Sequence, residues 1–471
     1  MLCQSGCWGA PFVNLFSSGC IEIVSRLANV LIASNSGPRL SDMVQDLSDY
    51  GYRVTQCTTA SGLLEEARIG KPDLAMIDLA APIFDGMELA GMLIGKTDTG
   101  TMPVVVFGAD GSEELFKRAV ETGVDDIFTD PFDIVEMRFR LMPLLRLATM
   151  RRELDERTGL AERFGAEIAT SGTSNLNPKL ELLQIGRDLG EVESLKKIMG
   201  GECAITTTPS AFTADLLLNS KPFFDACFLA IDEVGSTMSP EQAMDLCERI
   251  RLSPRLFNMP VVLINPHEGG IDPAEALRGG ATRVVPRRAE DGELYAALTI
   301  LGRRQQSRWQ IRQAMDKCLT PQTTDGRTGA YTFEFMRAHM ESLVAAARVR
   351  DKHLTLVFFS FPDAPGVKEQ FGDAASDHLL KQLSQWINAM IRVEDMVAHF
   401  RGHDFCIALP DTPVDEAMYV MNRIAGVLTY TDFALVEVYQ PVTISVEFGI
   451  AEIEKGDTID ALIDRARAHL D

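Results

Sequence analysis

The chain has 471 residues, of which 45 are Lys or Arg and 67 are Asp or Glu, so its formal net charge is −22. This acidic balance argues against non-specific binding to nucleic acid or to anionic membranes, because both would repel the chain at long range. No apolar run reaches the roughly 18 residues that span a bilayer. The cysteines form no C-x-x-C pair, which argues against a zinc ribbon or a disulfide framework. We expect a reduced, cytoplasmic protein of several domains, with no membrane insertion, no nucleic-acid partner and no bound metal.

Residues 1–28 show no periodic pattern of apolar residues. They include aromatic residues and glycines, but they lack the positively charged start of a secretory signal peptide. Two interpretations stay open for this stretch. It is either a disordered leader or the result of a start site assigned too early, with Val24 as the alternative start.

Residues 29–150 alternate short apolar strands with helical stretches. The expected strands are 30–32, 52–55, 73–78, 103–107 and 126–129, and the expected helices are 39–50, 61–68 and 113–121. This alternation predicts parallel βαβ units, in which functional groups gather at the carboxyl ends of the strands. A doubly wound α/β domain follows from the pattern.

A second, looser copy of this pattern covers residues 179–305. Its expected core strands are 182–185, 226–231, 260–264 and 283–285. A single duplication at this spacing indicates two similar domains and argues against a solenoid. Charged helical segments at 144–163 and 298–319 follow the two copies, and we expect them to run on through linkers at 151–178 and 306–324.

Residues 325–471 have a different organisation. The expected elements are strands 354–359, 396–400, 405–409 and 442–453 and helices 374–390 and 416–428. The second and third of these strands flank a tight turn and predict a β-hairpin. The region is therefore expected to be an α+β domain around a mostly antiparallel sheet.

The first domain resembles response-regulator receiver domains, through the strand 72–78 and the loop 82–87 that follows it. This resemblance places Asp78 at the phosphoacceptor position. Receivers also need an acidic pair that holds Mg²⁺ during phosphoryl transfer. Ser34 and Asn35 occupy those two positions here.

Other receiver positions have changed as well. Gly108 stands in place of the family's Thr or Ser, and Asp130 replaces a lysine, so that a carboxylate would repel the phosphoryl group. We interpret Asp78 as a vestigial phosphoacceptor, with phosphorylation as the alternative. In the second copy the phosphoacceptor position aligns with Ala230, which suggests a structural or dimerising domain.

The third domain resembles GGDEF domains, which condense two GTP molecules into cyclic di-GMP. The resemblance covers residues 354–412 and the entry segment 325–330, and the order of domains is that of the PleD class. The fold class expected is therefore α/β, with two tandem flavodoxin-like, doubly wound receivers followed by an α+β, nucleotidyl-cyclase-like GGDEF domain. The signature itself is degenerate and reads Arg401, Gly402, His403, Asp404 and Phe405.

The departures from the signature affect metal and phosphate binding. In the family, carboxylates at the positions of Ser360 and His403 hold the divalent metals that polarise phosphate oxygens. Mg²⁺ prefers anionic oxygen ligands, which neither residue supplies. Arg401 replaces a glycine that lets the backbone approach the phosphates. We expect no catalytic residues, no catalytic Mg²⁺ and no cyclase activity; a weak diguanylate cyclase is the alternative.

One family site is retained. Arg392 and Asp395 form the R-x-x-D motif of the inhibitory site of GGDEF domains, and Arg423 stands where the family has a further arginine. The resemblance implies binding of cyclic di-GMP as an intercalated dimer. The chemistry fits, because an arginine fork can donate to guanine O6 and N7. A carboxylate can accept from guanine N1–H and N2–H.

The resemblance to inactive members of the PleD class also implies a cellular role. It predicts a cyclic di-GMP effector and scaffold that forms a homodimer and localises to a cell pole. There it would recruit a protein adaptor of cell-cycle-regulated proteolysis. A response regulator driven by phosphorylation at Asp78 is a further alternative.

Overall fold

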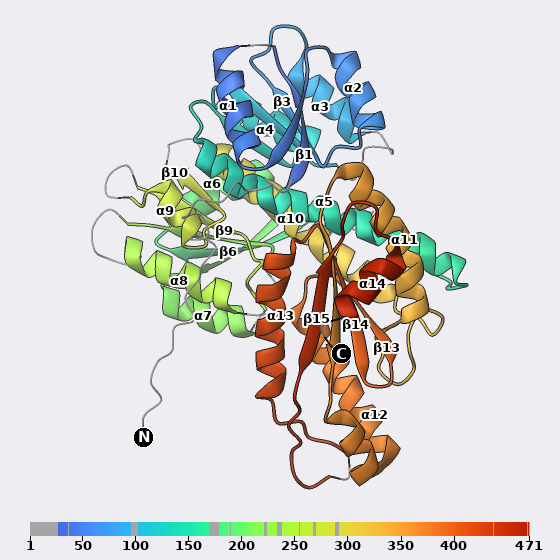
Figure 1. The fold of residues 1–471 in the computed structure, drawn as a ribbon. Helices are drawn as coiled ribbons and strands as arrows, with labels where there is room; N and C mark the ends of the chain where they lie inside the picture. Colours follow the sequence, from blue (N-terminus) through green and yellow to red (C-terminus); the bar gives the residue numbers. More distant parts are fainter. Residues whose placement is uncertain are drawn as a thin grey trace.

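The computed structural model describes residues 27–35, 37–95, 102–168, 179–188, 190–220, 224–232, 238–253, 255–266, 270–287, 292–436, 438–468 and 470. The predicted leader lies outside these residues up to position 26. The described residues form three five-stranded sheets, each with its own helices (Figure 1). Over the same residues, no helix combines the length and apolar content needed to cross a bilayer.

The first sheet has the strand order β2-β1-β3-β4-β5, and all its pairs are parallel. This is the flavodoxin-like, doubly wound order. Apart from the edge strand β2, its strands are mostly buried because helices cover both faces, which explains the apolar runs of β1, β3 and β4. The strands are β1 (Ala28–Ala33), β2 (Tyr52–Cys57), β3 (Leu74–Asp78), β4 (Val104–Ala109) and β5 (Asp126–Thr129). The helices are α1 (Pro38–Asp49), α2 (Ala60–Ile69), α3 (Gly86–Ile94), α4 (Glu113–Thr122) and α5 (Ile134–Arg163).

The second sheet repeats this order as β7-β6-β8-β9-β10, which confirms the duplication. Strand β7 was not predicted, because its threonine-rich sequence is only partly buried and lacks an apolar run. The strands are β6 (Leu180–Gly186), β7 (Cys203–Thr208), β8 (Ala226–Ala230), β9 (Val261–Asn265) and β10 (Arg283–Pro286). The helices are α6 (Glu191–Met199), α7 (Ala211–Ser220), α8 (Pro240–Leu252), α9 (Pro273–Arg278) and α10 (Gly292–Lys317).

The third sheet, β11-β13-β14-β12-β15, is antiparallel except for the pair β11–β13, as expected. The strand predicted from 442 is wrong in its first half, because Val442 pairs with Phe433 in an isolated bridge and β15 begins at Glu447. The strands are β11 (Tyr331–Thr332), β12 (Leu354–Ser360), β13 (Met396–Arg401), β14 (Asp404–Pro410) and β15 (Glu447–Glu452). The helices are α11 (Phe333–Arg350), α12 (Ala364–Met390), α13 (Val414–Thr429) and α14 (Ile459–Arg467).

The two α/β domains face each other through equivalent elements. Helix α10 packs against α4 and α5, and α5 packs against α9, the counterpart of α4. The buried carboxylate of Asp126 lies at this interface and pairs with Arg140, Arg283 and Arg304. Burial opposes ionisation of Asp126, but the three guanidinium charges hold its pKa far below the usual range. One carboxylate therefore ties β5 and α5 of the first domain to β10 and α10 of the second.

Helix α5 extends from the first domain into the third (Figure 1). Its first half lies in the core of the first domain, where Met137 and Leu141 are fully buried. Its last turns pack against α11, and Leu160 and Ala161 join the third domain's core beside Phe335. Residues 151–163, expected within a linker, are thus part of a continuous helix shared by two cores.

We predict that Asp126→Ala destabilises the protein by about 3–5 kcal/mol, because it leaves the guanidinium groups of Arg140, Arg283 and Arg304 buried without their carboxylate. Thermal and urea unfolding measure the effect. Arg118→Ala, which removes an exposed pair with Asp85, is the control and should cost under about 1 kcal/mol. Equal effects of the two substitutions would contradict the role given to Asp126.

Candidate functional site

The turn between α12 and β13 brings the three predicted ligand-binding residues together. The backbone N–H of Arg392 donates to Asp395 Oδ2 at 2.8 Å, and the Asp395 N–H donates to the Arg392 carbonyl at 3.2 Å. Arg423 reaches the same turn from α13, where its Nη2 donates to the carbonyl of Met390 at 3.1 Å. The turn thus brings together the Arg392 guanidinium group, the Asp395 carboxylate and, from α13, the guanidinium group of Arg423.

The two guanidinium groups at this turn are accessible to a ligand. The Arg392 side chain is 29% exposed, and its Nη2 lies 3.6 Å from Glu416 Oε2 on α13. Arg423 is exposed on the same helix. An exposed ion pair of this kind contributes little to stability. Phosphate or a guanine edge could therefore replace Glu416 as the partner of Arg392 at small cost.

Asp395 is held in a different environment. It is 6% exposed, and its Oδ1 has no hydrogen-bond partner among the described residues. Burial, and after it the negative charge of Glu394, raise the pKa of Asp395 to about 7, against the opposing charges of Arg392 and Arg157. Near neutral pH, the protonated and ionised forms of this carboxyl group are therefore both expected to be populated.

Helix α5 fixes the same turn from the other side. Arg157 donates through Nη2 to the carbonyl of Glu394 and through Nη1 to the carbonyl of Val393, and Arg146 Nε lies 3.7 Å from the Glu394 carboxylate. No local pattern predicts these contacts, since Arg157 and Glu394 lie 237 positions apart in the chain. Val393 packs against an apolar cluster on α5 and α10 that comprises Leu147, Met150, Ile311 and Met315.

The degenerate signature lies at the far end of β13, in the hairpin with β14. Gly402 has a φ of 56°, which favours glycine at this turn. Arg401 is exposed, and its guanidinium carbon lies 5.1 Å from the ring centroid of Phe400. Burial, followed by the charge of Arg327, lowers the pKa of His403, so its imidazole is a neutral nitrogen group here.

The other signature residues serve the hairpin and its core. Asp404 Oδ1 accepts a hydrogen bond from Ser360 Oγ at 2.9 Å, which links β14 to the end of β12. Phe405 is fully buried in the core. Within the described ranges, no group of three or more His, Cys, Asp or Glu side chains is arranged to hold a metal ion. Among Ser360 and the signature residues 401–405, only Asp404 has a carboxylate side chain.

Asp78 lies at the carboxyl end of β3, where its carboxylate is already bonded. It accepts from Ser34 Oγ at 2.5 Å and from the backbone N–H of Ala80 at 2.9 Å. Gly108 comes close on the other side: a Cβ there would lie 2.6 Å from Asp78 Oδ1, and its φ of 88° disfavours a side chain. A serine or threonine side chain at position 108 would therefore be strained.

The equivalent place in the second domain is filled by an ion pair. Ala230 ends β8, where Asp78 ends β3. Arg287, just after β10, pairs with Glu191 at 2.9 Å and donates to the carbonyl of Ile231 at 3.2 Å. A cation thus covers the strand end where the first domain has a carboxylate.

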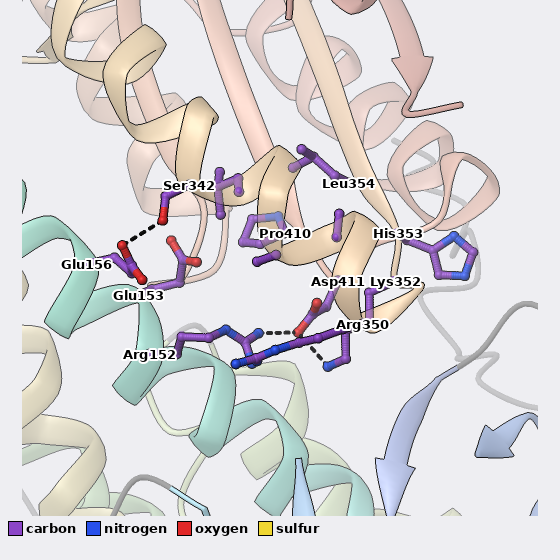
Figure 2. A pocket seen from close by; sticks show the side chains of 13 residues that line it. Arg152, Glu153, Glu156, Ser342, Arg350, Lys352, His353, Leu354, Pro410 and Asp411 are labelled. Carbon is purple, nitrogen blue, oxygen red and sulfur yellow. Dashed lines mark hydrogen bonds and ion pairs between the residues drawn. The ribbon is translucent and has the colours of Figure 1, made fainter. Parts of the chain in front are cut away.

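A polar junction joins the first domain, α5 and the third domain. Asp411 Oδ2 accepts from Arg152 Nη2 at 2.8 Å and from Lys352 Nζ at 3.1 Å (Figure 2). It also accepts from Thr149 Oγ1 at 2.6 Å. Asp73, before β3, pairs with Lys352 at 2.8 Å and with Arg152 at 3.4 Å. Burial alone would raise the pKa of Asp411, but the charges of Lys352 and Arg152 hold it far below its usual range. These paired groups make a structural junction.

Comparisons with known proteins identify two families in the chain. The model of the response regulator receiver domain matches residues 30–141. The model described as diguanylate cyclase, GGDEF domain, matches residues 322–471. The response regulator PleD of Caulobacter vibrioides is 21% identical over 451 residues, which cover 93% of this chain and 95% of PleD. The transcriptional regulatory protein KdpE of Mycobacterium tuberculosis is 30% identical over 192 residues, 38% of this chain and 83% of KdpE.

Solved structures of GGDEF domains are also similar to this chain. The GGDEF domain of DgcB from Caulobacter crescentus, solved in complex with c-di-GMP, has 17% identity and a TM-score of 0.31, and the match covers 32% of this chain and 85% of that one. The FimX GGDEF domain from Pseudomonas aeruginosa has 21% identity and a TM-score of 0.30, over 31% of this chain and 90% of that one.

We predict that Asp395→Asn stabilises the protein more at pH 8 than at pH 5. A carboxyl group with a raised pKa contributes stability below its ordinary value of about 4 and loses it as the pH rises through about 7. Asparagine does not ionise, and its Oδ1 can still accept from the Arg392 N–H. The difference in Tm between variant and wild type, measured across this range, should widen with pH. A constant difference would contradict the prediction.

Proposed function

The chain is a response regulator with a receiver domain at its N-terminus and a GGDEF domain at its C-terminus, and we propose that it is a cyclic di-GMP-binding effector whose own cyclase site is inactive. The observation that carries this proposal is the convergence of Arg392, Asp395 and Arg423 on one turn. Two arginine forks and a carboxylate supply the donors and acceptors that guanine edges and phosphates require.

The state of the turn is compatible with this ligand. Arg392 and Arg423 are accessible, and their present partners are a weakly held carboxylate and a backbone carbonyl. Asp395 has a buried carboxylate oxygen without a described partner, and a guanine N–H would give it one once the turn opens around this side chain. Stacked guanine bases of an intercalated cyclic di-GMP dimer would present several such edges together.

The signature turn supports the absence of catalysis. Ser360 and His403 stand where the family has metal-binding carboxylates, and Asp404 is engaged by Ser360. A neutral imidazole and a hydroxyl group are poor ligands for Mg²⁺. Arg401 adds a long side chain where phosphate would approach the backbone. We infer that no catalytic Mg²⁺ binds and that the domain is a pseudoenzyme.

The proposal includes a scaffold role. In the receivers, Asp78 is bonded to Ser34, and Arg287 covers the equivalent strand end of the second domain, so both sites serve the fold. The resemblance to inactive PleD-class proteins favours a homodimer that acts at a cell pole. It also favours recruitment of a protein adaptor of cell-cycle-regulated proteolysis.

The first test is calorimetric titration of cyclic di-GMP onto the full chain. We expect wild type to bind and Arg392→Ala to lose roughly 10- to 100-fold in affinity, since one bidentate arginine–guanine contact contributes about 1–3 kcal/mol. Arg337→Ala, on α11, removes an exposed arginine that pairs with Asp460 and is the matched control, with unchanged affinity. Wild type that does not bind would refute the function, and equal affinities would refute the site.

The second test is incubation of the full chain with GTP and Mg²⁺. We expect no cyclic di-GMP by chromatography, in contrast to an active GGDEF cyclase assayed in parallel. Dinucleotide that forms in proportion to protein concentration would support the alternative of a weak cyclase. Loss of such product in Asp404→Ala would then assign it to the signature turn.

A further inference from the structure

One face of α13 next to the Arg392–Asp395 turn carries an exposed aromatic ring. Glu416 on this helix pairs with Arg392, and Arg423 donates to the Met390 carbonyl. Residues at both ends of this helix face therefore contact the turn. Tyr419 lies between them. It is three positions after Glu416 and four before Arg423, a spacing that places all three on one side of a helix.

Tyr419 is open to solvent. Its side chain is 66% exposed, and within the described part of the chain its ring takes part in no aromatic pair. Tyr331, by contrast, is buried and stacks on Phe335 with a centroid distance of 5.0 Å. A large ring that remains in water beside two arginines is available to a planar ligand.

We propose that the ring of Tyr419 stacks on a guanine base of the cyclic di-GMP held by Arg392 and Arg423. This inference rests on the proposed function and adds a positioning residue to the same site. Aromatic side chains stack on bases because every base has a π-face, and an arginine can cover the other face of the same base. Tyrosine on α13 and the two arginines would then hold the base by its face and by its edge.

The surroundings of Tyr419 favour a nucleotide over an apolar protein partner. The residues that form the contacts between this helix face and the turn are charged, namely Glu416, Arg392 and Arg423. A protein interface core is depleted of charged residues, whereas a purine with its phosphates uses both the ring and the cations. A protein that docks on Tyr419 without nucleotide is therefore an outcome that would count against the proposal.

Titration of cyclic di-GMP onto full-length variants tests the stacking. We expect Tyr419→Ala to lose about tenfold or more in affinity, and Tyr419→Phe to bind within about twofold of wild type. The control is Tyr430→Ala, at the end of the same helix, where the side chain is 91% exposed. It should bind as wild type. Circular dichroism checks that each variant is folded.

A fluorescence measurement separates stacking from a merely structural role. Tyr419→Trp should bind cyclic di-GMP and show quenched, concentration-dependent tryptophan emission, because an indole stacked on guanine is quenched on contact. Wild-type affinity in Tyr419→Ala overturns the stacking while the proposed function stands. Equal losses in Tyr419→Ala and Tyr419→Phe would assign the effect to the hydroxyl group and also overturn it. Absence of binding by wild type overturns both proposals.

Discussion

The arrangement of the whole chain depends on a single helix, α5, that belongs to two hydrophobic cores. Two adjacent charged side chains of this helix contact the GGDEF domain: the partly buried Arg152 binds Asp411, and the buried Glu153 binds His339 at 2.9 Å. Because these groups are removed from water, loss of one partner would leave the other charge buried and unpaired. The receiver and the GGDEF domain are therefore held in one relative orientation by a rigid element and by paired charges, as Figure 2 shows for Arg152 and Asp411.

Helix α5 also contacts the Arg392–Asp395 turn. Arg157 of α5 binds backbone carbonyls of residues 393 and 394, so the helix that carries the receiver also shapes the turn of the R-x-x-D motif. Strand β13 leads from this turn to the signature hairpin, and its six residues span about 20 Å. The turn and the signature are thus separate sites on one strand. The departures from the signature at one end of β13 leave the Arg392 and Asp395 side chains at the other end in place.

Much of the fold could be predicted because its signals are local. The strands at 74–78 and 104–109 are apolar or nearly so, and they overlap the strands that the pattern predicted. The threonine-rich strand at 203–208 was missed because a half-exposed strand lacks that signal. The predicted convergence of Arg392 and Arg423 depended on a family resemblance, since the residues themselves give no reason for a helix to return to that turn.

The amino-acid sequence by itself determined the domain types, the duplication and the chemistry available at each site, because these depend on residue identity and short-range periodicity. Residue identity alone shows that Ser360 and His403 stand where the family has carboxylates, and that the R-x-x-D motif is retained. Only the tertiary structure decided that Asp126 would join two domains, that Asp395 would be buried beside Glu394, and that Tyr419 would stand exposed between two arginine contacts. Burial and charge pairing arise from residues far apart in the chain, and no local pattern encodes which of them will meet.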